Sequence, residues 1–278
     1  MSTHRNTLPL ALVATVSLLL SGCGSTPIFG GGGQQAANKP AVAEPPKLPE
    51  PKPDAREAAR LRIELAGLYL SRGSVTPALE EATSASKLDP DNAQAFNLLG
   101  LINMQLRDDA QAVGNFERAL RLSPSDPDVN NNYGWFLCER GRPMESIRLF
   151  QAALRSPLYA NADRTLANAG VCSRRGGDEA GARRFFEQAL VQQPAQPVAL
   201  FQLADMDFAA GNARQARVLM ERLMQATAPT PEVLWLGVRI ERALGDRKAE
   251  MLYAQQLRRT FPSAPETALL GGATQAPR

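Results

Sequence analysis

The chain has 278 residues, with 31 Lys or Arg against 28 Asp or Glu, so its formal net charge is only +3. This near balance, without basic blocks interleaved with aromatic residues, argues against a nucleic-acid partner. The only histidine is His4, which lies in a segment that we expect to be cleaved off. Ser-His-Asp or Cys-His catalysis and most zinc sites are therefore not expected, and no catalytic or metal residue is predicted.

Residues 1–22 are expected to form a signal peptide. After Arg5, residues 8–20 are almost wholly apolar, which matches the core of a signal peptide and is short for a membrane span. The segment Leu20-Ser21-Gly22-Cys23 resembles the lipobox of bacterial lipoproteins. That resemblance implies cleavage before Cys23 and a covalent lipid on its thiol, and Gly24 after it implies sorting to the outer membrane, on its periplasmic face. An ordinary secretory signal and a membrane-spanning anchor are the alternatives.

Residues 23–55 are expected to be a flexible linker. Four glycines at 30–33 are followed by Gln34, so they lack the lysine and hydroxyl of a phosphate loop. Six prolines between 40 and 53 favour extended chain, which reaches up to about 3.1 Å per residue. The linker would therefore hold the folded part of the chain clear of the membrane.

Residues 56–263 repeat with a period of about 34 residues. In the unit from Phe96 to Pro124, small residues at Gly100, Ala112 and Ala119 let two helices approach closely, and Phe116 fills the space between helix pairs. This looks like the tetratricopeptide (TPR) pattern. It predicts an all-α, right-handed superhelical solenoid of about six repeats and twelve helices, followed by a disordered tail at 264–278. The alternative is an ordinary helical bundle.

First helices of such repeats line a concave surface that binds peptides or protein segments. In this frame the predicted partner-binding groove carries Asn97, Leu101, Met104, Asn131, Trp135 and Arg164. Asn97 and Asn131 occupy one position in successive repeats, where asparagines of peptide-gripping TPR modules bond the ligand backbone. Trp135 is either a binding anchor or part of the core. Phe201 is expected in the core.

Cys138 and Cys172 fall on first helices of adjacent repeats, so we expect them to be neighbours in space. In an oxidising periplasm they could form a disulfide that joins the third and fourth repeats. Two reduced, buried cysteines are the alternative.

The stretch from Asn130 to Leu190 is more particular than a general repeat. Its Asn-Asn-Tyr-Gly, Phe-Leu-Cys, Pro-Leu-Tyr and Ala-Gly-Val-Cys segments resemble the PilF/PilW family, lipoproteins of type IV pilus biogenesis. The resemblance implies a pilotin, which binds secretin subunits and promotes their localisation and multimerisation in the outer membrane. Its partners would be those subunits and, through the lipid, the membrane. No cofactor beyond the lipid on Cys23, and no small-molecule substrate, is implied.

Two other roles stay open, namely a pilus-stabilising factor and a general envelope scaffold, for example for cell-wall enzymes. An enzyme is not expected, because no segment outside the repeats is long enough for a catalytic domain.

Overall fold

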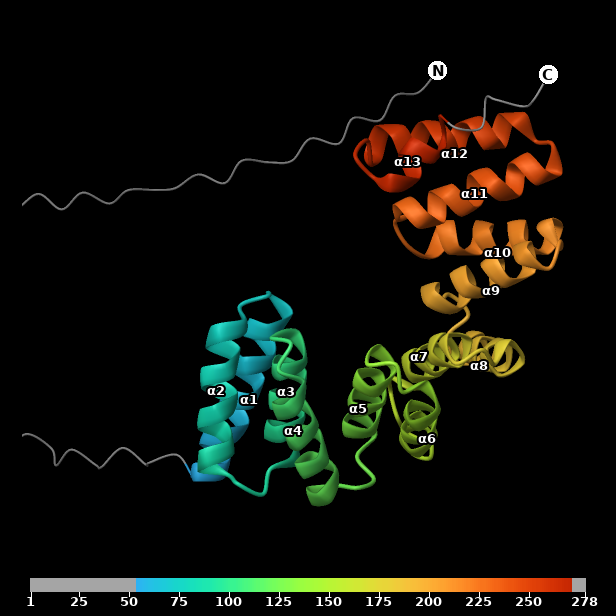
Figure 1. Ribbon diagram of the computed structural model, residues 1–278. Helices are drawn as coiled ribbons and strands as arrows, with labels where there is room; N and C mark the ends of the chain where they lie inside the picture. Colours follow the sequence, from blue (N-terminus) through green and yellow to red (C-terminus); the bar gives the residue numbers. More distant parts are fainter. Residues whose placement is uncertain (1–53, 272–278) are drawn as a thin grey trace, which may run out of the picture. The chain divides into compact units, whose positions relative to one another are not determined.

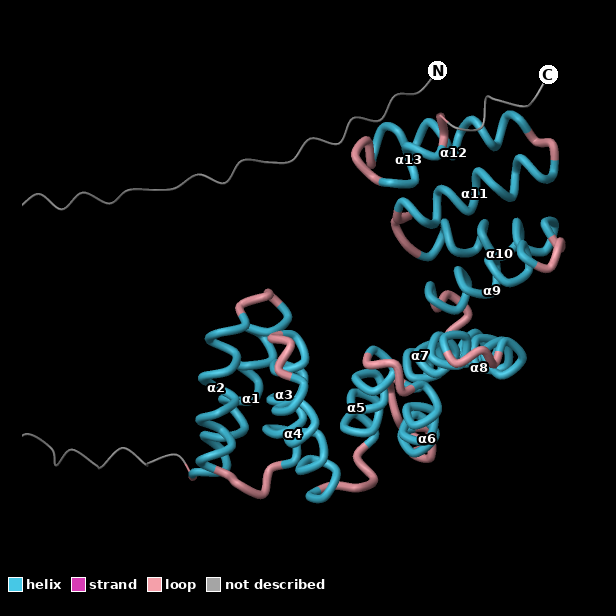
Figure 2. Tube along the Cα trace, in the orientation of Figure 1, coloured by secondary structure: helices cyan, strands magenta, loops and turns pink. Residues whose placement is uncertain are grey.

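The computed structural model describes residues 54–271, which form thirteen helices and no strand within that range (Figures 1 and 2). The predicted signal peptide, Cys23 and most of the linker lie outside the described residues. The helices are α1 (Ala55–Ser71), α2 (Val75–Leu88), α3 (Ala93–Gln105), α4 (Asp109–Leu122), α5 (Pro127–Glu139), α6 (Pro143–Ala153), α7 (Ala162–Arg175), α8 (Glu179–Gln192), α9 (Pro197–Ala209), α10 (Ala213–Ala226), α11 (Pro231–Leu244), α12 (Arg247–Thr260) and α13 (Pro265–Leu269).

Helices α1 to α12 form six hairpins of consecutive helices, each packed on the next. Every odd-numbered helix up to α9 also contacts the next odd-numbered helix, whereas successive even-numbered helices do not contact one another. The odd-numbered helices therefore make one continuous layer. This arrangement confirms the predicted all-α TPR superhelix, and the inner layer is built from the helices that the sequence assigned to it.

The hairpin turns repeat one backbone geometry. At each, a backbone N–H bonds the carbonyl five residues before it, as Asp108 N–H does to Asn103 O at 3.0 Å, which is the bond of a Schellman motif. The residue before that N–H has positive φ: it is glycine in five turns and Arg107, with φ 63°, in the α3–α4 turn. Aspartate side chains cap the amino ends of α4, α8 and α12, as where Asp178 accepts a hydrogen bond from Gly181 N–H at 2.8 Å.

Four of the six hairpins close on a glycine that faces a large ring, from Gly100 against Phe116 to Gly237 against Tyr253. An added Cβ at Gly100 would lie 2.6 Å from the Phe116 ring, and one at Gly170 only 2.4 Å from the Phe186 ring. Phe116, Phe150 and Phe186 are fully buried. Close approach of two helices at these positions therefore requires glycine, as the repeat pattern predicted.

The carboxyl end differs from the prediction of a disordered tail beginning at residue 264. Helix α13 packs on α11 and α12, and Leu270 after it is only 6% exposed. It lies in a cluster with Leu234, Val238, Ala254 and Leu257. This short helix and Leu270 thus cover apolar side chains of the last hairpin. Residues 272–278 lie outside the described part.

Within residues 54–271, no helix combines the length and the apolar character needed to cross a bilayer. The same residues contain no group of three His, Cys, Asp or Glu side chains placed to hold a metal ion.

Candidate partner-binding groove

A depression of about 480 Å³ lies where the carboxyl-terminal halves of α1, α3 and α5 meet. Its apolar lining comes from Leu70 on α1, Leu101 and Met104 on α3, and Trp135 on α5. All four side chains are partly exposed. The volume falls in the range of roughly 300–1,000 Å³ that is usual for ligand pockets. We call this depression the Trp135 groove.

The lining is fixed from beneath by the core. Leu101 and Met104 pack against the cluster that contains Phe116, Tyr133 and Phe136. Trp135 packs against the neighbouring cluster around Cys138, Phe150 and Cys172. The Trp135 ring rests on the core and also lines the groove, and its role as a binding anchor stays a prediction. Phe201 is partly buried and packs on a core cluster.

The Cys138 and Cys172 sulfurs are bonded, with 5.8 Å between the two Cα atoms. The bond joins α5 to α7, directly under Trp135. Beside it, the Arg175 guanidinium lies 5.4 Å from the centre of the Trp135 ring and pairs with Glu139. These contacts hold the indole in a fixed orientation at the groove wall.

Charged groups form the rim of the groove. Arg140 makes two hydrogen bonds of 2.7 Å to Asp109, and this contact lowers the pKa of the Asp109 carboxyl, with a smaller effect from the nearby charge of Arg107. Arg107 also lines the groove and is exposed. Sequence reasoning missed Arg107. The signal that could have found it is the missing turn glycine in the second repeat.

The asparagines lie deeper than predicted. Asn97 is only 5% exposed, so it does not line the groove surface. Its Oδ1 accepts a hydrogen bond of 3.2 Å from Asn132 of the next repeat. Asn131 is partly buried, and its Oδ1 accepts from Thr165 at 3.0 Å and from Asn168 at 3.2 Å. These side-chain amides link α3 to α5 and α5 to α7. Much of the hydrogen-bonding capacity that we predicted for a ligand is therefore used between neighbouring repeats.

Arg164 is exposed near the amino end of α7, whereas the groove lies at the carboxyl ends of α1, α3 and α5. The structure thus brings together Leu101, Met104 and Trp135 and leaves Asn97, Asn131 and Arg164 outside the groove.

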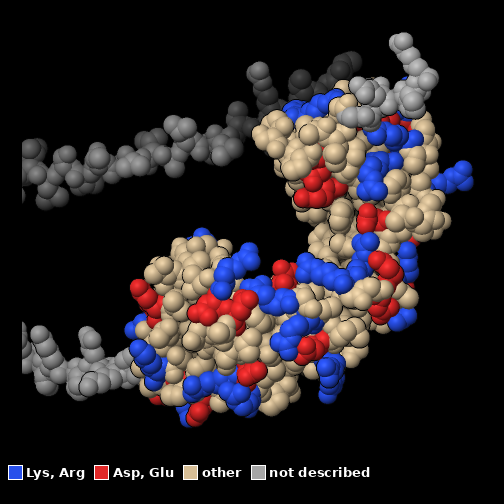
Figure 3. All heavy atoms as spheres, viewed as in Figure 1, with Lys and Arg blue, Asp and Glu red and all other residues tan. Residues whose placement is uncertain are grey.

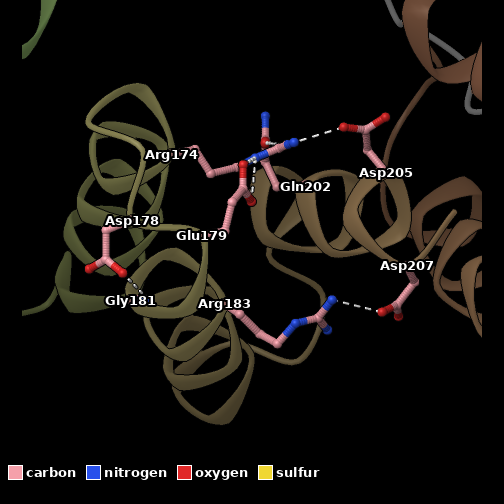
Figure 4. Close-up of polar contacts among 8 residues, drawn as sticks. All are labelled: Arg174, Asp178, Glu179, Gly181, Arg183, Gln202, Asp205 and Asp207. Atoms are coloured by element: carbon pink, nitrogen blue, oxygen red, sulfur yellow. Dashed lines mark hydrogen bonds and ion pairs between the residues drawn. The ribbon is translucent and has the colours of Figure 1, made fainter. Parts of the chain in front are cut away.

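Further along the inner layer, ion pairs replace the apolar lining. Arg174 on α7 bonds Gln202 at 2.6 Å and Asp205 at 3.1 Å on α9, with Glu179 beside it (Figure 4). Arg183 bonds the buried Asp207 at 2.9 Å. Acidic partners in neighbouring repeats engage Arg174, Arg175 and Arg183. Over the face in Figure 3, basic and acidic side chains are mixed.

The comparisons with known proteins agree with this architecture. The family model of the tetratricopeptide repeat matches residues 63–228. The type IV pilus assembly protein PilF of Pseudomonas aeruginosa is 28% identical over 222 residues, which cover 80% of this chain and 87% of PilF.

Two solved structures are also similar. PilW, a widely conserved type IV pilus biogenesis factor, is 31% identical with a TM-score of 0.69, and the match covers 76% of this chain and 97% of PilW. The structure of P. aeruginosa PilF is 27% identical with a TM-score of 0.72, over 78% of this chain and 98% of that one. The resemblance predicted from the segment Asn130 to Leu190 is confirmed. The chain belongs to the tetratricopeptide repeat proteins and, among them, to the PilF/PilW family.

Proposed function

We propose that this chain is an outer-membrane lipoprotein of type IV pilus biogenesis that acts as a pilotin. It binds secretin subunits, brings them to the outer membrane and promotes their multimerisation. The observation that carries the proposal is the similarity of nearly the whole repeat domain to PilF and PilW. Proteins built from these repeats are generally interaction scaffolds rather than enzymes.

The mechanism is physical. A lipid on Cys23 confines the chain to the inner leaflet of the outer membrane, and several acyl chains make that anchor effectively permanent. The linker that follows lets the repeat domain sample a volume next to the leaflet. Confinement raises the effective concentration of the binding surface for a subunit that arrives there.

The inner layer supplies that binding surface. The Trp135 groove offers a preformed apolar floor that a partner side chain can bury, and apolar burial with an aromatic anchor gives much of the affinity of small interfaces. The Cys138–Cys172 bond beneath the groove limits how far the third and fourth repeats can separate. The groove is therefore preorganised, which lowers the entropy cost of binding.

The test is a strain that lacks this protein. Its envelope is separated without boiling and probed for the secretin multimer, and twitching motility is recorded. The proposal predicts that the multimer disappears while secretin monomer remains. If the multimer persists but pili are lost, the chain is a pilus-stabilising factor. If both persist, it is a general envelope scaffold.

The anchor has its own test. A Cys23→Ser chain is expected to fold normally but to leave the outer-membrane fraction and to fail in secretin assembly. Retention of Cys23→Ser in that fraction, with normal pili, contradicts the anchoring part of the proposal.

A further inference from the structure

The guanidinium of Arg107 lines the Trp135 groove at a backbone position where the other repeats carry glycine. Its φ of 63° matches the values of 74° to 83° at Gly73, Gly141, Gly177, Gly211 and Gly245. For an L-residue with a side chain, this left-handed region costs roughly 1–2 kcal/mol. The second repeat thus carries an arginine at a position where its own fold favours glycine.

The guanidinium of Arg107 makes no direct polar contact within the described part of the chain. Across residues 54–271, no hydrogen bond or ion pair within 4.0 Å engages its side chain, and it acts on Asp109 only through space. Asp109 is already held by two hydrogen bonds from Arg140. The other acidic side chain of the rim, Glu139, is paired with Arg175. Arg107 therefore supplies positive charge at the rim that no partner neutralises.

We propose that the Trp135 groove selects a partner segment in which a large apolar side chain is followed closely by a carboxylate. The apolar side chain is buried against Leu101, Met104 and Trp135. The carboxylate binds the Arg107 guanidinium at the rim, where a charge-assisted hydrogen bond forms at the edge of an apolar surface. This inference rests on the proposed role of the groove in protein binding and names the chemistry of the segment that it binds.

The geometry separates two contributions. Trp135 and its neighbours supply burial, which is tolerant of side-chain shape, whereas Arg107 supplies a single fixed charge. Removal of the Arg107 charge is expected to change which segments bind more than it changes the stability of the groove. If Arg107 were retained for packing alone, its removal would lower stability and would not change which segments bind.

The probe is a phage-displayed library of random 12-residue peptides, selected on the full chain in detergent. We expect enriched peptides to place Phe, Leu, Met or Trp within two positions of Asp or Glu. The best peptide, and its Asp→Asn or Glu→Gln counterpart, are then synthesised and titrated by fluorescence anisotropy against the wild type and four variants.

Trp135→Ala and Arg107→Gly are each expected to weaken the acidic peptide by about threefold to tenfold. Arg107→Gly should bind the acidic and amide peptides alike, because the charge that distinguishes them is gone. Arg164→Ala removes a charge from the same layer outside the groove. Met144→Ala removes a 72% exposed apolar side chain that lines a separate depression between α6 and α8. Both controls should change affinity by less than about twofold.

The unfolding temperature of Arg107→Gly gives a second readout, which should not fall although the affinity for the acidic peptide does. Because glycine relieves the strained position, Arg107→Gly should unfold at the wild-type temperature or up to about 4 °C above it. The proposal is overturned if no peptide is enriched, if enriched peptides lack acidic residues, or if Arg107→Gly keeps wild-type affinity. Loss of secretin multimer is scored separately in the deletion strain, so a failure of the pilus role is distinguishable from a failure of this binding preference.

Discussion

At the scale of single residues, glycine sets the distance between the paired helices. Gly170 faces Phe186 so closely that a methyl group would meet the ring at 2.4 Å. We predict that Gly170→Ala lowers the free energy of unfolding by about 1–3 kcal/mol, through overpacking of a buried site. Urea unfolding at 25 °C measures this loss.

The matched control is Gly114→Ala, on the exposed side of α4, where nothing lies within 4 Å of the added Cβ. There alanine should gain about 0.5–1 kcal/mol, because only backbone entropy and helix propensity change. Equal effects at the two positions would mean that the Phe186 contact does not limit helix separation.

Tyr159 gives the molecule a predicted sensitivity to alkaline pH. Burial, with a hydrogen bond of 2.8 Å to Asp128, raises the pKa of Tyr159 to about 12 from its ordinary value of 10.0. Between these values the unfolded chain has lost the phenolic proton that the folded chain keeps, so stability falls as pH rises from about 10 to 12.

In Tyr159→Phe the loss of stability between pH 9 and pH 11.5 should be smaller than in the wild type, as measured by urea midpoints. It should not vanish, because burial also raises the pKa of Tyr133 and of Tyr253. A variant with the full alkaline loss would exclude Tyr159 as a contributor.

At the scale of elements, the Cys138–Cys172 bond joins α5 and α7 across 34 residues of chain. Cross-linking a loop of this length restricts the unfolded chain and typically contributes about 2–4 kcal/mol. The double variant Cys138→Ser/Cys172→Ser should therefore lose stability by that amount in urea unfolding without reductant. With dithiothreitol, the wild type should fall to a similar level and the double variant should not change further.

Helix α13 is the second element whose contribution can be measured. A chain that ends after Ser263 loses Leu270, which is buried on α11 and α12, and should lose about 2–3 kcal/mol from that apolar contact. A chain that ends after Gly271 keeps the contact and should be more stable than the shorter chain by that free energy. If both truncations have full stability, α13 does not cap the repeats.

At the scale of the whole molecule, the repeat fold could be predicted because each level of the pattern agrees: period, small-to-large contacts and turn glycines all indicate paired helices. The groove was predicted in part. Leu101 and Met104 share one face of α3, and Trp135 holds the position of Leu101 one repeat later on α5, which periodicity reveals. The burial of Asn97 depends on how closely α3 approaches α5, and its hydrogen bond with Asn132 depends on the side-chain rotamers of the two residues. The spacing of residues along the sequence predicts neither of these. Helix α13 was missed because five residues carry no period.

A stack of repeats also predicts how the molecule opens, because each hairpin is stabilised mainly by its neighbours. Among the described helices, the first hairpin packs on a neighbouring hairpin on one side only. Helices α1 and α2 bury only alanines completely (Ala59, Ala66, Ala78, Ala82 and Ala85). By contrast α5 buries Phe136, Leu137 and other large side chains, and the disulfide connects it to α7. Backbone amides of α1 and α2 should therefore exchange with deuterium first, and those of α5 to α8 last.

Reduction of the Cys138–Cys172 bond tests whether the hairpins of the stack open separately. Once the Cys138–Cys172 bond is reduced, exchange should accelerate mainly in α5 to α8 and the repeats that pack on them. Exchange in α1 and α2, which we expect to open independently, should change little. Mass spectrometry of peptic fragments from oxidised and reduced protein resolves the two regions. Uniform exchange along the chain, accelerated uniformly by reduction, would instead show that residues 54–271 unfold as one cooperative unit, and the end-to-centre gradient would be wrong.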